Sequence, residues 1–294
     1  MTRYNGVFTA LVTPFLPDGG IDWPAFDALI DRQLAAGIAG LVPVGTTGEA
    51  ATLTEDEAQA LIARTVQRVA GRAVVLAGAG ANDTAKAVRA ALRAEAAGAD
   101  GVLVVTPYYN KPTQAGLIAH FAAVAQAVRC DVMLYSVPGR AVVAIAPETA
   151  AVLARAHANI IGIKEAGGDA TRVTALRLAC GPGFVVHSGD DGLALAFYAL
   201  GAVGLTSVVS NYAPEACVAL HRAWVTGDTA GALALHERLA PLTEAMFAET
   251  SPAPVKRALA LDGVMGDGLR LPLVGIGAQT EAQLRAAMAG FRAG

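Results

Sequence analysis

The chain has 294 residues, of which 54% are hydrophobic and 16% are charged, and its formal net charge is −3. This length and apolar content predict one large folded domain with an appendage and exclude a disordered chain. The small negative charge, without any basic block, argues against nucleic acid and an anionic membrane surface as partners.

No apolar stretch approaches the length of a membrane-spanning helix, and the N-terminus lacks the order of a signal peptide. Cys130, Cys180 and Cys217 are odd in number and widely spaced, which fits reduced packing residues better than a disulfide or metal site. The five histidines also lack metal-ligand spacing. We therefore expect a cytoplasmic protein without a metal.

Short β-rich apolar runs alternate with Ala-rich helical stretches along the chain. The expected strands are Gly6–Val12, Gly40–Val44, Ala73–Ala77, Gly101–Val105, Asp131–Tyr135, Ile160–Lys164, Phe184–His187 and Val203–Thr206. The helices expected between them are Trp23–Ala36, Glu55–Ala70, Thr84–Ala97, Gln114–Val128, Pro147–Ala154, Thr171–Ala179 and Leu193–Ala199.

Strands that are apolar throughout and joined by helices imply a parallel sheet covered on both faces. Eight such units over roughly 220 residues match the count and size of an α/β fold of the (β/α)8 TIM barrel type. A doubly wound open sheet is the rival, but no G-x-G-x-x-G opens a helix in this chain. The strand count therefore favours the barrel.

After the eighth strand the pattern contains helices only. They are expected at Pro214–Val225, Thr229–Ala248, Pro254–Leu261 and Glu281–Gly290. We place a boundary near Gly227-Asp228, so that residues 1–227 form the catalytic barrel and residues 228–294 form a small C-terminal helical domain.

In a barrel of this kind, the catalytic groups follow the carboxyl ends of the strands. The second strand is followed by Gly45–Glu49, in which Thr46 and Thr47 stand between glycines. Such a turn can offer backbone N–H groups and hydroxyls to a carboxylate. The alternative is an ordinary turn before the helix whose start Thr54 and Glu57 mark.

Phenols follow the next informative strands. Tyr108 and Tyr109 lie in a Pro-bounded loop after the fourth strand, as an interface plug, a proton-carrying phenol, or both. The fifth strand ends in Tyr135, and Arg140 stands just beyond a turn. Arginine matches a carboxylate by a bidentate fork, although a surface salt bridge is the alternative.

Lys164 closes the apolar run Ile160–Ile163 and is followed at once by a glycine-containing loop. An uncharged lysine amine at the mouth of an apolar strand can attack a ketone. The alternative is a strand-end lysine whose ammonium extends into water. The seventh strand leads into Ser188–Asp191, a loop and helix cap, and the eighth into Thr206.

A lysine, phenols, paired threonines and an arginine are thus expected at one rim, without a metal set or a phosphate cradle. This combination suits Schiff-base chemistry on an α-keto acid, with the lysine attacking the keto carbon. The threonine turn would hold the carboxylate while hydroxyls move protons. The iminium acts as the electron sink, so no added cofactor is expected.

The same residues resemble a known family, the dihydrodipicolinate synthases. The resemblance runs from about Gly6 to Leu269–Pro272. Its superfamily also includes N-acetylneuraminate lyase and other pyruvate aldolases, and Arg140 after the Tyr-x-x-Pro element points to the synthase. The motifs that carry it are Gly45–Glu49, Val105–Tyr109, Tyr135–Arg140, Ile161–Glu165 and Ser188–Asp191.

The resemblance implies a condensation of pyruvate with aspartate-4-semialdehyde to hydroxytetrahydrodipicolinate, toward diaminopimelate and lysine. It implies that Lys164 forms the Schiff base with pyruvate and that Tyr135 is the main proton donor and acceptor. Thr46 and Tyr109 would complete a proton relay, with Tyr109 reaching into the site of a neighbouring subunit. Family members are commonly homotetramers built as a dimer of dimers.

The resemblance also assigns the groups that bind substrate. Thr47 and the backbone near Thr206 would hold the pyruvate carboxylate. Arg140 would receive the carboxylate of aspartate-4-semialdehyde or of its adduct, and Gly189 would line the pocket. Ser136, where the family often has Asn, and Thr206, where it usually has an aliphatic residue, depart from the pattern without removing a catalytic group.

The position of lysine feedback inhibition departs further from the family. Asn82 and Tyr108 fit, but Lys86 replaces an acidic residue expected to meet the inhibitor's ammonium. Glu55 and Ala58 replace histidines found in sensitive members. Because a cation there repels a cationic ligand, we expect weak or absent inhibition by L-lysine.

Two other functions share these residues. A pyruvate-dependent aldolase acting on a sugar acid or a hydroxylated keto acid would use the same Lys164, Tyr135 and threonine turn, and Arg140 with Tyr109 favours the synthase over it. A barrel that binds a keto acid without turnover is the other alternative. Such relatives usually lose the lysine or a relay hydroxyl, and this chain retains all of them.

Overall fold

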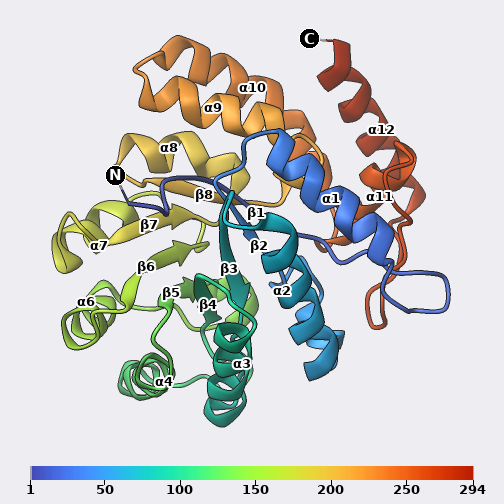
Figure 1. Ribbon diagram of the computed structural model, residues 1–294. Helices are drawn as coiled ribbons and strands as arrows, with labels where there is room; N and C mark the ends of the chain where they lie inside the picture. The colour runs from blue at the N-terminus through green and yellow to red at the C-terminus, as the bar shows by residue number, and fades with distance from the viewer. Residues whose placement is uncertain (1, 294) are drawn as a thin grey trace.

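The computed structural model describes residues 2–293, and its centre is a closed barrel of parallel strands in the order β1 to β8 (Figure 1). The expected (β/α)8 barrel is therefore confirmed. The strands are β1 Gly6–Ala10, β2 Gly40–Val42, β3 Val74–Gly78, β4 Gly101–Val105, β5 Asp131–Ser136, β6 Ile160–Glu165, β7 Val185–Ser188 and β8 Gly204–Ser207.

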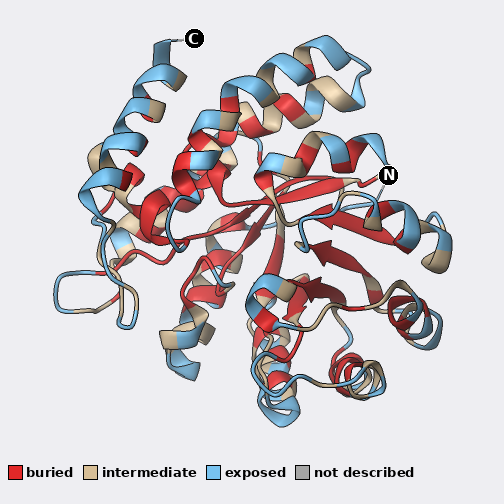
Figure 2. Cartoon of the chain, turned by 180° about the vertical axis from the view of Figure 1, so that it is seen from behind, coloured by how far each residue is buried: buried red, intermediate tan, exposed pale blue. Residues whose placement is uncertain are grey.

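Helices surround this barrel, and Figure 2 shows buried strands at the centre and exposed residues on the outer sides of the helices. The helices up to the eighth strand are α1 Trp23–Ala35, α2 Glu55–Val69, α3 Thr84–Ala96, α4 Gln114–Ala127, α5 Pro138–Ala141, α6 Pro147–Ala156, α7 Arg172–Cys180 and α8 Ala194–Ala199. Short 3-10 turns are η1 Ala50–Thr52, η2 Asp191–Leu193 and η3 Val209–Asn211.

The start of α2 illustrates how the sequence fixes these helices. The side chain of Thr54 accepts a hydrogen bond from the backbone N–H of Glu57, and the Glu57 carboxylate accepts one from the N–H of Thr54. This reciprocal cap satisfies two amide groups that a helix terminus otherwise leaves free. The expected helix start after Thr54 is therefore confirmed.

The barrel interior is filled by apolar side chains that point inward from successive strands. Phe8, Val42, Leu76, Leu103 and Met133 belong to one buried cluster, and each is at most 3% exposed. This packing leaves the polar residues that follow the strands at the barrel rim. Packed side chains therefore close the barrel beneath any substrate cavity at the carboxyl ends of the strands.

Several strands end at other residues than the apolar pattern predicted. β2 stops at Val42 because Pro43 has no N–H to donate and Val44 has a left-handed φ of 57°. Strands β5 to β8 each continue one residue further. Backbone pairing joins Ser136 to Glu165 and Glu165 to Ser188, although these residues are polar.

The helices after the eighth strand are α9 Pro214–Val225, α10 Thr229–Met246, α11 Ala253–Leu261 and α12 Ala278–Ala293. Asp228 caps α10, which packs against α9 and α12, and α11 packs against α12 (Figure 1). The division into domains at residues 227 and 228 stays a prediction.

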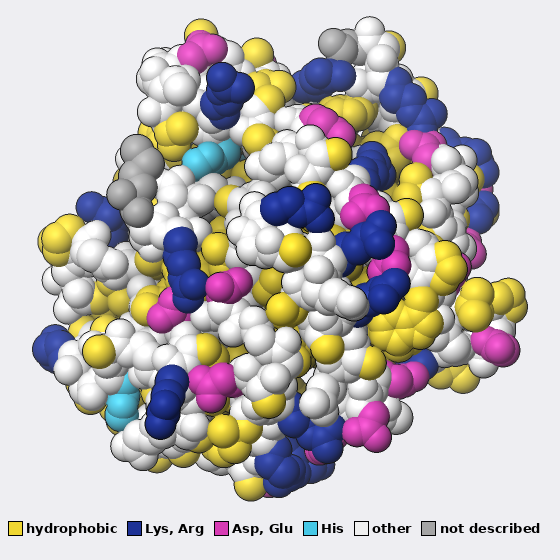
Figure 3. All heavy atoms as spheres, in the orientation of Figure 1, with side chains coloured by type: hydrophobic (Ala, Val, Ile, Leu, Met, Phe, Trp, Pro, Cys, Tyr) yellow, Lys and Arg dark blue, Asp and Glu magenta, His cyan; other side chains and the backbone are white. Residues whose placement is uncertain are grey.

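Charged side chains of both signs are interspersed over the face that Figure 3 shows. Ion pairs join neighbouring elements, for example Arg64 of α2 with Asp27 of α1. Among the helices of residues 2–293, none has the length and apolarity that crossing a membrane requires.

Candidate active site

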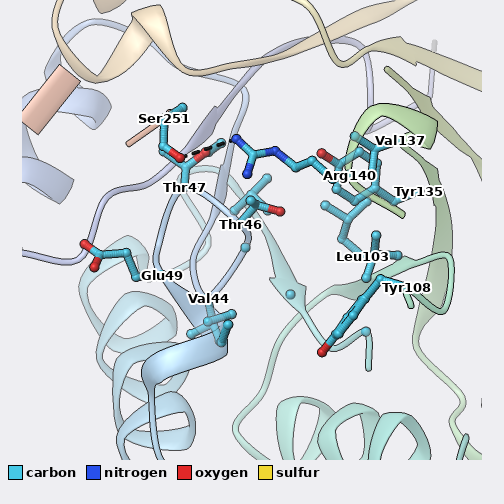
Figure 4. Close-up of a pocket in the computed structure, with 18 of the residues that line it drawn as sticks. Val44, Thr46, Thr47, Glu49, Leu103, Tyr108, Tyr135, Val137, Arg140 and Ser251 are labelled. Atoms are coloured by element: carbon cyan, nitrogen blue, oxygen red, sulfur yellow. Dashed lines mark hydrogen bonds between the residues drawn. The ribbon is translucent and has the colours of Figure 1, made fainter. Parts of the chain in front are cut away.

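A cavity of about 370 Å³ opens at the carboxyl ends of the strands (Figure 4). Strand residues and the loops that follow them form most of its wall, as expected for a barrel enzyme. Five of the predicted site residues line this cavity together: Thr46, Thr47, Tyr135, Arg140 and Lys164.

Lys164 lies in β6 directly beside Tyr135 of β5, because the two residues are paired in register across the strands. Its side chain is buried, with 6% of the residue exposed, and Nζ lies 4.3 Å from the centroid of the Tyr135 ring. Tyr135 is itself only 7% exposed. An amine and a phenol are therefore held next to each other at the cavity wall.

The residue after Lys164 fixes the loop that leaves β6. The carboxylate of Glu165 is fully buried and accepts hydrogen bonds from Arg172 Nε at 2.9 Å and from the Gly167 N–H at 2.8 Å. Burial raises the pKa of Glu165, and the charge and hydrogen bond of Arg172 oppose that shift. This contact anchors the backbone immediately beyond the lysine.

The turn after β2 presents the two threonines. Thr47 is buried, whereas Thr46 is exposed at the mouth of the cavity. A Cβ on Gly48 would come within 3.1 Å of two backbone atoms, so the turn fits closely against the neighbouring chain. The Thr13 hydroxyl donates to the Gly48 carbonyl at 2.8 Å and ties the turn to the segment after β1.

Arg140 enters from the short helix α5, which the sequence did not predict. Its Nη2 donates to the carbonyl of Ser251 at 3.4 Å, the dashed contact in Figure 4. Arg140 is otherwise exposed at the mouth, where its guanidinium remains available to an anionic ligand.

Gly189 and Thr206 lie outside the set of residues that line the cavity. Gly189 nevertheless contacts the lysine closely, since a Cβ built on it would lie 3.0 Å from Lys164 Cε. Its N–H donates to the Glu165 carbonyl at 2.7 Å. Thr206 is fully buried in β8.

The Thr206 hydroxyl lies 3.1 Å from Nδ1 of His187, and His187 Nε2 lies 2.6 Å from the Tyr4 carbonyl. Burial lowers the pKa of His187 to about 4, so the ring is neutral near pH 7. A carbonyl only accepts, which assigns the ring proton to Nε2. Thr206 therefore donates its proton to Nδ1.

Tyr109 is not brought to the cavity of its own chain. It is 88% exposed and has a left-handed φ of 75°. Its neighbour Tyr108 lines the cavity instead (Figure 4). From the sequence, Tyr108 was expected either as an interface plug or proton-carrying phenol beside Tyr109, or at the effector position.

The C-terminal segment also contributes to the cavity, through Ser251, Pro272 and Leu273, and none of these residues was predicted at the site from the sequence. The family-like stretch Leu269–Pro272 was the one available signal for part of this segment. No local pattern indicated Ser251, whose hydroxyl is buried without a hydrogen-bond partner among the described residues.

Within residues 2–293, no group of three or more His, Cys, Asp or Glu side chains is arranged to hold a metal ion. The polar residues that line the cavity supply an amine, phenols, hydroxyls, a guanidinium and the carboxylate of Glu49. Amine nucleophiles of this kind form Schiff bases with carbonyl substrates, and adjacent hydroxyls can move the protons.

A (β/α)8 barrel with a buried lysine beside a phenol at its carboxyl rim defines a lyase of the Schiff-base aldolase class. A model of the dihydrodipicolinate synthetase family matches residues 3–290, and the chain belongs to this family. It is 48% identical over 288 residues to the 4-hydroxy-tetrahydrodipicolinate synthase of Acidiphilium cryptum (strain JF-5), covering 98% of both chains. The corresponding protein of Chelativorans sp. (strain BNC1) is 48% identical over 285 residues, with 97% of both chains covered.

Solved structures give the same result. The 4-hydroxy-tetrahydrodipicolinate synthase of Methylacidiphilum fumariolicum SolV matches with a TM-score of 0.97 at 42% identity, covering 98% of this chain and 96% of that chain. A monomeric dihydrodipicolinate synthase variant matches with a TM-score of 0.96 at 40% identity, covering 99% and 97%. The family resemblance inferred from the sequence motifs is therefore confirmed.

Proposed function

We propose that this chain condenses pyruvate with L-aspartate-4-semialdehyde to 4-hydroxy-tetrahydrodipicolinate, a step of diaminopimelate and lysine biosynthesis. Membership of the family supports this activity. The observation that carries it is the buried Lys164 amine, which lies 4.3 Å from the ring of Tyr135 at the wall of the cavity. A cytoplasmic location agrees with the three free cysteines.

The chemistry follows from the amine. Lys164 Nζ adds to the keto carbon of pyruvate, and loss of water from the carbinolamine gives an iminium. Removal of a methyl proton yields an enamine, whose carbon attacks the aldehyde of the second substrate. The amino group of the adduct then displaces Lys164 and closes the ring. One water is lost overall and no substrate is oxidised or reduced, so these reaction steps need no added cofactor.

Proton transfer is assigned to the hydroxyl groups near Lys164. Tyr135, whose ring centroid lies 4.3 Å from Lys164 Nζ, serves the carbinolamine, iminium and enamine steps. Thr46 lies at the exposed mouth of the cavity, where it connects Tyr135 to solvent through Tyr109. Because Tyr109 is 88% exposed in its own chain, we assign it to the site of a second copy within a homotetramer built as a dimer of dimers.

The two substrate carboxylates take different partners. Thr47 and the backbone near Thr206 hold the pyruvate carboxylate, and Gly189 leaves room for the lysine and its adduct. Arg140 stands at the mouth of the cavity and binds the carboxylate of the semialdehyde. A guanidinium matches a carboxylate bidentately, and its charge remains fixed near neutral pH.

Borohydride trapping tests the central step. Wild-type protein incubated with pyruvate and borohydride should gain a reduced adduct at Lys164, and a Lys164→Ala variant should gain none. A coupled assay then compares aspartate-4-semialdehyde with N-acetylneuraminate and keto-deoxy sugar acids. No adduct on the wild-type protein would refute the mechanism, and turnover of only the sugar acids would refute the assigned substrate.

The shared site has its own test. Lys164→Ala and Tyr109→Phe variants, each of low activity alone, should regain activity when mixed under conditions that exchange subunits. A mixed pair contains one site with both native residues only if Tyr109 acts across the interface. Unchanged activity on mixing, despite exchange seen by mass spectrometry, would contradict this assignment.

A further inference from the structure

The turn that carries Thr46 and Thr47 has a left-handed backbone at both of its ends. Val44 and Glu49 each have a φ of 57°, a region that non-glycine residues rarely occupy. The β-branched side chain makes this conformation especially unfavourable at Val44. Such a backbone persists only where its surroundings hold it.

The Glu49 side chain connects this turn to the C-terminal segment. Figure 4 shows its carboxylate directed away from Thr46 and Arg140. Oε1 accepts a hydrogen bond from Lys256 Nζ at 2.6 Å, and Oε2 accepts one from the Arg270 N–H at 3.1 Å. Both partners are more than 200 residues away in the sequence, with separations of 207 and 221.

Lys256 of α11 holds the turn from a second side as well. Its Nζ also donates to the Thr13 carbonyl at 2.8 Å and lies 4.5 Å from the centroid of the Phe15 ring. Thr13 in turn donates its hydroxyl to the Gly48 carbonyl. One ammonium group therefore meets the turn directly at Glu49 and indirectly at Gly48.

The contact between Lys256 and Glu49 is an ion pair inside the protein. Their side chains are 0% and 1% exposed. Burial lowers the pKa of Lys256, and the Glu49 carboxylate opposes that shift. A buried pair of this kind is costly to desolvate and often no better for stability than apolar residues of similar volume.

We propose that Lys256 is a positioning residue for catalysis, because through Glu49 and Thr13 it fixes the turn that presents Thr46 and Thr47 to the substrate. The inference rests on the proposed function and extends it to a residue outside the cavity wall. Helix α11, which follows the barrel in the chain, would then contribute to the reaction. A role in fold stability alone is the competing explanation.

The two explanations predict different kinetics. A displaced turn moves Thr47, which raises KM for pyruvate, and moves Thr46, which lowers kcat. Lys164 belongs to a different strand, so it should still form an adduct at high pyruvate concentration. A loss of stability alone would reduce the amount of folded enzyme and leave kcat and KM of the folded fraction unchanged.

The neighbouring residue Arg257 gives a matched control. It lies on the same helix and pairs with Glu281 and Asp267, away from the turn. We expect Lys256→Met to lower kcat/KM for pyruvate at least tenfold, with both a higher KM and a lower kcat. Arg257→Met should remain within about twofold of the wild-type protein, although both changes remove an ion pair.

A double variant guards against simple unfolding. Lys256→Met leaves the Glu49 carboxylate buried without its cation, which is strongly destabilising. Adding Glu49→Gln removes that charge and should restore the melting temperature. Under the positioning role the double variant keeps the tenfold loss of kcat/KM, because the turn has lost its clamp.

The outcomes separate this inference from the proposed function. A double variant with wild-type Tm, kcat and KM would overturn the positioning role while the wild-type enzyme still formed its pyruvate adduct. Equal losses in Lys256→Met and Arg257→Met would overturn it as well. A wild-type protein that formed no adduct would refute the proposed function, and with it this inference.

Discussion

Gly189 provides a direct test of how tightly the barrel rim holds the nucleophile. An alanine Cβ at this position would lie 2.6 Å from the Ala166 Cβ and 3.0 Å from Lys164 Cε. Ala166 cannot retreat easily, because its N–H is bonded to the Ser136 carbonyl at 2.9 Å. The 2.6 Å contact therefore forces the backbone at residue 189 to shift, and the flexible lysine chain must give way as well.

The size of the effect follows from these distances. Overpacking a well-filled site costs about 1–3 kcal/mol of stability. A misplacement of the reacting amine by about 1 Å costs roughly 100-fold in rate. We therefore expect Gly189→Ala to melt a few degrees lower than the wild-type protein. It should form the pyruvate adduct 10- to 100-fold more slowly, and its kcat/KM should fall by about the same factor.

Gly183 supplies the control for this experiment. It lies just before β7, at the opposite end of the same strand, and a Cβ there meets nothing within 4 Å. Gly183→Ala should keep wild-type rates in borohydride trapping and in the coupled assay. If Gly189→Ala formed its adduct as fast as the wild-type protein, the tight contact with Lys164 would have no catalytic meaning.

Three further predictions follow from the site. Arg140→Ala should raise KM for the semialdehyde about 10- to 100-fold, because one charged hydrogen bond is lost. The rate of pyruvate trapping should stay unchanged. An unchanged KM would show that the guanidinium does not bind the semialdehyde. L-Lysine should inhibit weakly or not at all, because Lys86 is an exposed cation at the position where the family resemblance places the inhibitor's ammonium. Half-inhibition below millimolar L-lysine in a steady-state assay would disprove this. The pKa of His187 is lowered to about 4 by burial, so the unfolded chain binds more protons between pH 4 and its ordinary value near 6.5, and stability should fall as pH falls through this window. The free energy of unfolding, measured with urea, should rise with pH across this window in the wild-type protein and rise less steeply in a His187→Gln variant. An equal rise in both proteins would contradict the lowered pKa of His187.

The fold was predictable because each strand of the barrel is an apolar run with a helix before the next one. The strand ends were not, since hydrophobicity reports burial and does not report backbone pairing. Ser136, Glu165 and Ser188 continue their strands as polar residues because neighbouring strands still pair with them. Pro43 ends β2 early because proline has no backbone N–H to donate, which the pattern of apolar residues does not indicate.

The candidate site divides in the same way. Residues directly after strands, such as Lys164 and Tyr135, could be placed together because the carboxyl ends of parallel strands meet at one rim. The side chains that close the cavity from the C-terminal segment could not. Ser251 reaches Arg140 across 111 residues of sequence, and no local pattern encodes such a contact.

The departure from the family pattern at Thr206 has a physical explanation in the barrel interior. A threonine hydroxyl buried where an aliphatic residue is usual would lose its hydrogen bonds to water and needs a partner. His187 provides one, because its neutral ring donates to the Tyr4 carbonyl and accepts from Thr206. The two polar residues therefore depend on each other, and neither is explained by its own sequence context. Since Thr206 still pairs in register with Phe8, the exchange leaves the backbone of β8 in place for the role proposed for it.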